Sequence, residues 1–212
     1  MNAGTWALFA ATLVVAAIDW WAVGRGNVGL EYVAKPATMV MLFLATVAIE
    51  PHDTTVQTAF LIAIVFSLGG DVFLMLPQDL FVFGLASFLC GHVAYVVGMV
   101  IDGIDPTWAA VAGVVVGLLL VTLGRKILGA VKASDTPELF GPVVVYIGVI
   151  SIMVVSAAGT GRPIALVGAL LFYSSDALIA WTRFIADVKY GRLIVMITYH
   201  LGQIGICLSL AS

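Results

Sequence analysis

Long uninterrupted runs of apolar residues, separated by short polar breaks, dominate the sequence. A helix that crosses the hydrocarbon core of a bilayer needs about 20 apolar residues. We predict eight such helices, at about 5–23, 35–50, 57–76, 81–101, 107–124, 140–158, 163–182 and 192–211. The breaks hold turn-forming residues, as in 77–79 (PQD) and 159–163 (GTGRP). The longest break, at about 125–139, carries several charges and is expected to be a connection outside the membrane.

Composition supports this fold class. Of the 212 residues, 62% are apolar and 10% are charged, whereas a soluble domain has about 45–50% and about 25%. These values exclude a soluble globule and a disordered chain. The net charge of −3, without a basic run, excludes nucleic acid as a partner. The continuous run Val111–Leu123 does not alternate as the strands of an outer-membrane barrel do. We therefore expect an all-α integral membrane protein, with one polytopic membrane domain over residues 1–212.

The basic residues predict an orientation, because cytoplasmic loops are enriched in Lys and Arg. With the N-terminus outside, eight of the nine Lys and Arg residues fall on the cytoplasmic side, and only Arg162 lies opposite. The eight are Arg25, Lys35, Arg125, Lys126, Lys132, Arg183, Lys189 and Arg192. We expect both termini outside, multi-pass insertion in a bacterial inner (plasma) membrane, and a site in its cytoplasmic half.

Three pairs of residues recur at nearly one offset along the chain. They are Asp71 and Asp176 (105 apart), His92 and His200 (108 apart), and Pro36 and Pro142 (106 apart). These offsets fit a 4+4 parallel tandem repeat over residues 1–105 and 106–212. Parallel repeats of this kind place a shared site at the interface between the repeats.

Two aspartates lie deep in the predicted spans. An ionisable residue there costs roughly 2.5–3.5 kcal/mol on insertion scales and is by default a functional candidate. Asp71 and Asp176 lie about five and six residues before the cytoplasmic ends of their spans, which is about 8 and 9 Å at 1.5 Å per residue. Their equal depth predicts a paired site. Asp19, next to Trp20 and Trp21, is expected at the interface, where aromatic belts are ordinary.

Other polar residues converge on this depth, and each has a structural alternative. They are Lys35, Ser67, His92, Tyr95, Arg183, Arg192, Tyr199, His200 and Gln203. Lys35, Arg183 and Arg192 would bind a lipid phosphate at the rim or serve only as positive-inside anchors. Ser67, His92, Tyr199 and Gln203 would order water or orient a carboxyl, and Tyr95 and His200 would support the site. All six would otherwise be polar groups between helices. Gly84 and Gly91, on the same face as Tyr95, fit close helix packing equally well.

Two buried carboxyl groups favour general acid–base chemistry. In a low-dielectric site they do not both ionise readily, so the pair offers a proton donor and a proton acceptor. Reactions through an oxocarbenium ion suit such a pair. No G-x-S-x-G motif is present. A metal site built from Asp71, Asp176, His92 and His200 would match no zinc motif, and both cysteines lie in apolar spans, as core residues do.

Five stretches carry a resemblance to a known family. They are 34–38 (AKPAT), 66–77 (FSLGGDVFLMLP), 84–95 (GLASFLCGHVAY), 168–176 (GALLFYSSD) and 199–203 (YHLGQ). In these stretches the chain resembles the YhhN family of membrane proteins, which includes transmembrane protein 86 of animals. The resemblance runs from the second predicted span to the eighth.

The resemblance implies lysoplasmalogenase activity, in which the vinyl ether bond of a lysoplasmalogen (a lysophospholipid) is hydrolysed to a fatty aldehyde and a glycerophospho-base. It implies Asp71 and Asp176 as the catalytic pair, membrane lipids as surroundings, and neither a metal nor an organic cofactor.

The residues leave three other functions open. A proton-coupled carrier and a lipid-binding bundle without hydrolysis both accommodate two membrane aspartates. An intramembrane aspartyl protease would need glycine at position 68, where Leu68 stands.

Overall fold

The computed structural model describes residues 1–211. Within this range, eight helical segments are long and apolar enough to cross a membrane, so the chain is a multi-pass integral membrane protein and the predicted number of spans is confirmed. The helices are α1 (Ala3–Arg25), α2 (Val28–Val47), α3 (Thr54–Met75), α4 (Phe81–Asp102), α5 (Pro106–Leu119), α6 (Arg125–Ala133), α7 (Phe140–Gly159), α8 (Pro163–Phe184) and α9 (Gly191–Leu208). Helices α5 and α6 together make one of the eight spans.

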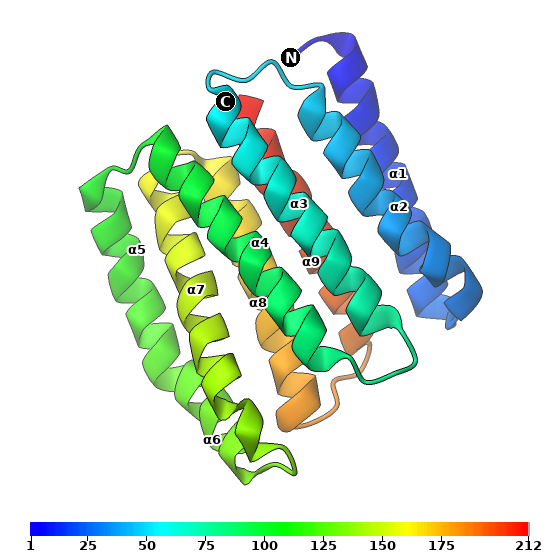
Figure 1. Ribbon diagram of the computed structural model, residues 1–212, viewed down its shortest axis with the longest axis vertical. Coiled ribbons are helices and arrows are strands. Elements are labelled where there is room, and N and C mark those ends of the chain that lie inside the picture. The colour runs from blue at the N-terminus through cyan, green and yellow to red at the C-terminus, as the bar shows by residue number, and fades with distance from the viewer. Residues whose placement is uncertain (212) are drawn as a thin grey trace.

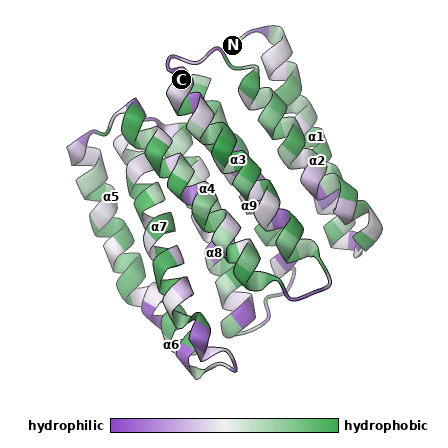
Figure 2. Cartoon of the chain, in the orientation of Figure 1, coloured by the Kyte–Doolittle hydropathy of each residue, from purple (hydrophilic) through white to green (hydrophobic). Residues whose placement is uncertain are grey.

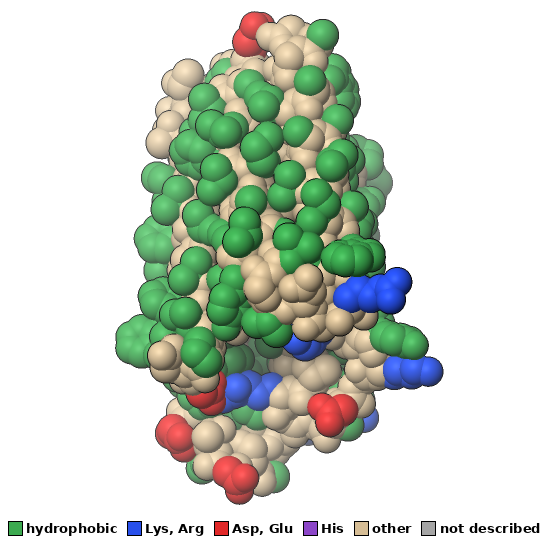
Figure 3. All heavy atoms as spheres, turned by 90° about the vertical axis from the view of Figure 1, so that its right-hand side faces the viewer, with side chains coloured by type: hydrophobic (Ala, Val, Ile, Leu, Met, Phe, Trp, Pro, Cys, Tyr) green, Lys and Arg blue, Asp and Glu red, His purple; other side chains and the backbone are tan. Residues whose placement is uncertain are grey.

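The helices form a bundle in which the two ends of the chain lie at the same end (Figure 1). Helix α1 packs closely on α2, α3 on α4, and α8 on α9, while α7 contacts α4, α5 and α8. Hydrophobic residues cover the middle of the helices, and hydrophilic residues gather mostly near their ends (Figure 2). On the face made by α1 and α2, charged side chains surround a recess at the end away from the termini (Figure 3).

Helix α2 begins at Val28 rather than near residue 35, where the sequence placed it. Gly26 ends α1 in the left-handed conformation (φ 67°), and the Asn27 side chain accepts a hydrogen bond from the backbone N–H of Leu30 at 3.2 Å. A two-residue turn therefore joins the helices. Pro36, at the beginning of the predicted span, lies inside the helix. Lys35 is consequently about two turns from the start of α2 and is buried.

The prediction of a connection over 125–139 is wrong for most of its length. Helix α6 continues from α5 through a π-helical segment, Leu120–Gly124. Ile127 and Val131, four residues apart, are both buried on one face of α6, and the Lys126 ammonium lies 4.3 Å from the ring centroid of Trp181. The charges thus belong to an amphipathic helix, because its two faces meet different surroundings.

Small residues allow each helix that carries an aspartate to pack closely against a neighbour, α8 against α9 and α3 against α4. A Cβ atom at Gly168 of α8 would lie 2.6 Å from the backbone nitrogen of Ile206 and 2.8 Å from the carbonyl oxygen of Gly202, both on α9. A Cβ at Gly91 of α4 would lie 3.1 Å from the carbonyl oxygen of Ala63 on α3. The glycines of α4 therefore serve close packing, one of the two alternatives that the sequence left open.

Candidate active site

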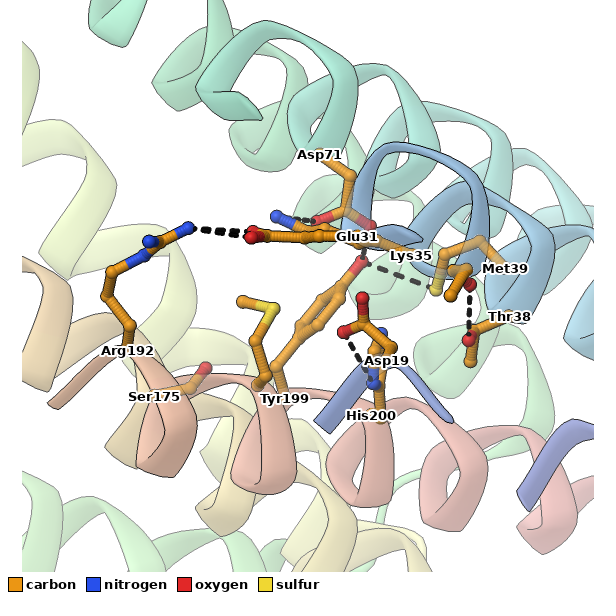
Figure 4. Close-up of polar contacts among 12 residues, drawn as sticks. Asp19, Glu31, Lys35, Thr38, Met39, Asp71, Ser175, Arg192, Tyr199 and His200 are labelled. Carbon is orange, nitrogen blue, oxygen red and sulfur yellow. Dashed lines mark hydrogen bonds and ion pairs between the residues drawn. The ribbon is translucent and has the colours of Figure 1, made fainter. Parts of the chain in front are cut away.

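Asp71 lies inside the bundle between a lysine and a tyrosine. The Nζ of Lys35, on α2, lies 3.2 Å from Asp71 Oδ1, and the hydroxyl of Tyr199, on α9, donates a 2.6 Å hydrogen bond to Oδ2. Figure 4 shows the three side chains meeting from three helices. The side chains of Asp71 and Lys35 are only 1% and 6% exposed. Since a charged group is costly to bury unless it is paired, Lys35 is a partner of this carboxyl rather than an anchor at the membrane surface.

Asp176 has a second, separate set of partners. The hydroxyl of Tyr146, on α7, donates a 2.6 Å hydrogen bond to Asp176 Oδ2, and the Nε2 of His92, on α4, lies 3.1 Å from the same oxygen. Tyr146 and His92 also contact each other, with 3.0 Å between Oη and Nε2. The three polar atoms therefore form a triangle, and each lies within hydrogen-bonding distance of the other two.

Aromatic rings, rather than a direct contact, connect the two carboxyl sites. Within residues 1–211, no hydrogen bond or ion pair joins Asp71 to Asp176. The ring of Phe172 lies 5.2 Å from that of Tyr199 and 4.7 Å from that of His92, measured between centroids. Phe172 thus touches one partner of each aspartate, and the sites are neighbours without forming a carboxyl–carboxyl pair.

The two aspartates contact corresponding helices in the two halves of the chain. Asp71 on α3 contacts the preceding helix, α2, and the last helix of the second half, α9. Asp176 on α8 contacts the preceding helix, α7, and the last helix of the first half, α4. Each aspartate therefore depends on both halves of the chain.

A polar cavity of about 550 Å³ opens at the recessed end of the bundle. Its lining includes Lys35, Arg183 and Arg192, the three basic residues that the sequence assigned to the rim, together with the acidic Glu31 and Asp187. We call this cavity the polar mouth. Its wall therefore carries charges of both signs, with three basic and two acidic side chains.

Two ion pairs fix the arginines of the polar mouth. Arg192 donates to both carboxylate oxygens of Glu31, at 2.8 and 2.9 Å. Arg183 donates to Asp79 at 2.8 Å, and this bond holds the pKa of the Asp79 carboxyl, in the loop after α3, below its ordinary value. Arg183 therefore contacts the α3–α4 loop rather than Asp176, seven residues before it on α8.

An apolar cavity of about 60 Å³ lies next to the polar mouth, and we call it the apolar chamber. Leu74, Phe81 and Ile179 line both spaces. Asp176 and Tyr146 are among the few polar side chains in the chamber wall, which also includes the end of the π-helical segment and residues of α4, α6, α7 and α8. The charged mouth thus adjoins an apolar space whose wall contains one of the two aspartates.

The other predicted residues have different surroundings. Tyr95 donates its hydroxyl to Gln203 Oε1 and lies 3.5 Å from the sulfur of Cys207, so its hydrogen bonds do not reach either aspartate. Ser67 is buried where α3 meets α4, with its Oγ 3.1 Å from the Cβ position of Gly91. Both residues occupy helix interfaces, and Tyr95 and its partner Gln203 also interact electrostatically with Tyr199, which contacts Asp71.

His200 contacts a third aspartate, which the sequence placed at the membrane interface. That expectation was wrong, since the Asp19 side chain is fully buried, 4.0 Å from His200 Nδ1. The indole nitrogen of Trp20 donates to the same Nδ1 at 3.1 Å. Within residues 1–211, no group of three or more His, Cys, Asp or Glu side chains is placed to hold a metal ion; His92 and His200 instead serve different aspartates.

Comparison with known proteins places this arrangement in a family. The YhhN family model matches residues 30–210. The chain belongs to the YhhN family. Among curated relatives, it is 34% identical over 163 residues to the Bos taurus protein named lysoplasmalogenase TMEM86A, a match that covers 72% of this chain and 65% of the relative. It is 31% identical over 147 residues to Homo sapiens lysoplasmalogenase TMEM86B, covering 69% and 61%.

The matched segments therefore span just under two thirds of these relatives' lengths. No solved structure matches this YhhN-family chain significantly.

Proposed function

We propose that this YhhN-family chain is a lysoplasmalogenase-like hydrolase of the membrane. It would cleave the vinyl ether bond of a lysophospholipid of the lysoplasmalogen type, releasing a fatty aldehyde and a glycerophospho-base. The observation that carries the proposal is that a polar mouth lined by three basic residues adjoins an apolar chamber whose wall contains Asp176. The names of the relatives in the same family support the choice of substrate.

A lysophospholipid matches this shape because it has one charged head and one apolar tail. Its phosphate would bind in the polar mouth, where the guanidinium of Arg192 and the ammonium of Lys35 supply positive charge. Its tail would enter the apolar chamber past Leu74 and Phe81, which line both spaces. The vinyl ether bond, between head and tail, would then lie near the boundary of the two spaces, close to Asp176.

The reaction needs a proton, water and a stabilised cation. Protonation of the vinyl ether carbon farther from oxygen gives an oxocarbenium ion, to which water adds. The resulting hemiacetal collapses to the aldehyde and the alcohol. Asp71 and Asp176 are the acid–base groups of this proposal, since a carboxylic acid supplies the proton and a carboxylate stabilises the cation.

Membrane orientation and the repeat are parts of the same proposal. The polar mouth lies at the end of the bundle that holds most loop lysines and arginines, which favours the cytoplasmic half of an inner (plasma) membrane with both termini outside. The matched contacts of Asp71 and Asp176 favour a 4+4 parallel repeat.

The proposal is tested by incubating the purified protein with lysoplasmalogen in detergent micelles and measuring aldehyde by mass spectrometry. In D₂O the aldehyde is expected to carry one deuterium on the carbon next to the carbonyl, because the proton delivered to that carbon comes from solvent. The saturated alkyl ether lysolipid is the matched control, and it should remain intact. A folded protein that leaves lysoplasmalogen unchanged would refute the hydrolase, and uptake without cleavage in proteoliposomes would favour a carrier.

A further inference from the structure

The two aspartates differ in their access to the cavities. The Asp176 side chain is 8% exposed and lines the apolar chamber. The Asp71 side chain is 1% exposed and lines neither the chamber nor the polar mouth. A substrate in the chamber can therefore reach Asp176 directly, whereas Lys35 and Tyr199 stand against both oxygens of Asp71.

They also differ in how their charge is compensated. Asp71 has the ammonium of Lys35 on one oxygen and a hydroxyl donor on the other, so a permanent cation faces this carboxyl directly. Among residues 1–211, no lysine or arginine forms an ion pair with Asp176, and the nitrogen that contacts it belongs to His92. A carboxylate without a permanent cation is costly in an apolar wall. His92 and Tyr146 are therefore the groups that stabilise this carboxyl.

The partners of Asp176 are arranged to hold and exchange one proton. Tyr146 Oη, His92 Nε2 and Asp176 Oδ2 are separated by 2.6, 3.0 and 3.1 Å. A proton can therefore pass between imidazole and carboxyl without movement of the backbone. The His92 ring is fixed by edge contacts with Phe172 and Tyr146, at 4.7 and 5.3 Å between centroids.

We propose that Asp176 is the residue that touches the substrate and delivers the proton, that Tyr146 and His92 position it, and that Asp71 is a positioning residue which holds Lys35 and Tyr199. This inference rests on the proposed function, because it divides the roles within the same site. It separates two carboxyls that the sequence treated as equivalent.

One carboxyl group, that of Asp176, can give and recover the proton that the hydrolysis needs. The O–H of Asp176 gives its proton to the vinyl ether carbon farther from oxygen, and the π electrons of the C=C bond form the new C–H bond. The resulting cation shares its charge with the ether oxygen. Water adds to the cationic carbon and returns a proton to the Asp176 carboxylate, which restores the acid. The hemiacetal hydroxyl proton then moves to the glycerol oxygen as the C–O bond breaks.

A covalent probe tests this division of roles without relying on turnover. Dicyclohexylcarbodiimide dissolves in apolar phases and reacts with carboxylic acids, whose O–H adds across its C=N bond. On the wild-type protein in detergent, peptide mapping is expected to find the adduct on Asp176 and not on Asp71. The Asp71→Asn variant should still be modified at Asp176. Modification of Asp71, of both equally or of neither overturns the inference.

Steady-state kinetics provide a second measurement. They distinguish a failure of this division of roles from a failure of the proposed function. We expect Asp176→Asn to lose at least about 10³-fold in kcat, within the range for a general acid, and Asp71→Asn to keep measurable turnover with one deuterium in the aldehyde. Tyr146→Phe should lower kcat about 10-fold with KM unchanged, while Tyr190→Phe, outside both cavities, should not. Equal losses at the two aspartates would overturn the division but leave the hydrolase standing. A wild type without aldehyde release would refute the proposed function, and the adduct would still report on the division.

Discussion

Arg192 reaches from α9 to α2 and contacts both carboxylate oxygens of Glu31 through Nη2, at 2.8 and 2.9 Å. The Glu31 side chain is only 6% exposed, whereas that of Arg192 is 71% exposed. The carboxylate therefore fixes one side of the guanidinium and leaves the rest facing the polar mouth. An arginine held in this way is prepared to bind a phosphate, because little of its freedom remains to be lost.

Arg192→Gln is expected to raise KM for the lysolipid about 10-fold with little change in kcat, which corresponds to a loss of about 1.4 kcal/mol of binding free energy. The reason is the loss of a charged contact to the head rather than of a group near the vinyl ether. Steady-state kinetics measure the effect. Arg25→Gln, at the end of α1 and outside the polar mouth, is the control. An unchanged KM in Arg192→Gln would place the phosphate elsewhere.

Lys35→Met should lower the free energy of unfolding by about 3–5 kcal/mol, because it leaves the buried Asp71 carboxylate without its cation. The double variant Lys35→Met with Asp71→Asn should recover much of this loss, since both charges are then absent. Thermal unfolding in detergent, analysed as a double-mutant cycle, measures the coupling. Lys132→Met, at an exposed lysine, is the control. Additive effects of the two changes would show that the pair contributes nothing.

Gly168→Ala should destabilise the protein by about 1–3 kcal/mol, because the new methyl group would lie 2.6 Å from the Ile206 backbone nitrogen. Activity should fall as well, since α8 carries Asp176 and α9 carries Tyr199. The control is Gly148→Ala in α7, where a Cβ meets nothing within 4 Å, and helix propensity there favours alanine by up to about 1 kcal/mol. Equal melting temperatures for the two variants would contradict the tight α8–α9 crossing.

Val143→Phe is expected to narrow the apolar chamber and to reduce kcat/KM more for long-tailed lysolipids than for short-tailed ones. Val143 is buried in the chamber wall, whereas its neighbour Val144 is 39% exposed on the outside of α7. Val144→Phe is therefore a matched control of the same size change, and it should keep the tail-length profile of the wild type. A parallel decrease for all tail lengths in Val143→Phe would argue against tail binding in the chamber.

The number of spans could be predicted from the sequence, because length and apolar composition are enough to identify a membrane helix. The prediction misplaced the start of α2, which begins at Val28 and not near Lys35. It also took α6 for a connection because its charges outweighed the two buried positions, Ile127 and Val131. Both errors concern segment ends, where hydropathy is a weak guide.

For the site, the sequence singled out the acidic residues but not all their partners. Tyr146 was missed, because one tyrosine in an apolar run carries no signal until its helix is placed beside α8. The pairing of Glu31 with Arg192 was missed for the same reason. Asp19 was assigned to the interface from its two tryptophan neighbours, although its α1 position faces α9. Tertiary packing decides which side of a helix faces which neighbour, and this cannot be predicted from one sequence.

Helix α9 follows α1, α2 and α3 in the chain and completes the polar interior that these helices begin. Lys35 and Asp71 stand on consecutive helices, so this hairpin enters the bilayer with its opposite charges already matched. Tyr199 and His200, which contact Asp71 and Asp19, are made after both aspartates. A nascent chain stalled before α9 would leave Asp19 in lipid without His200, and membrane quality control would have a buried carboxyl to detect.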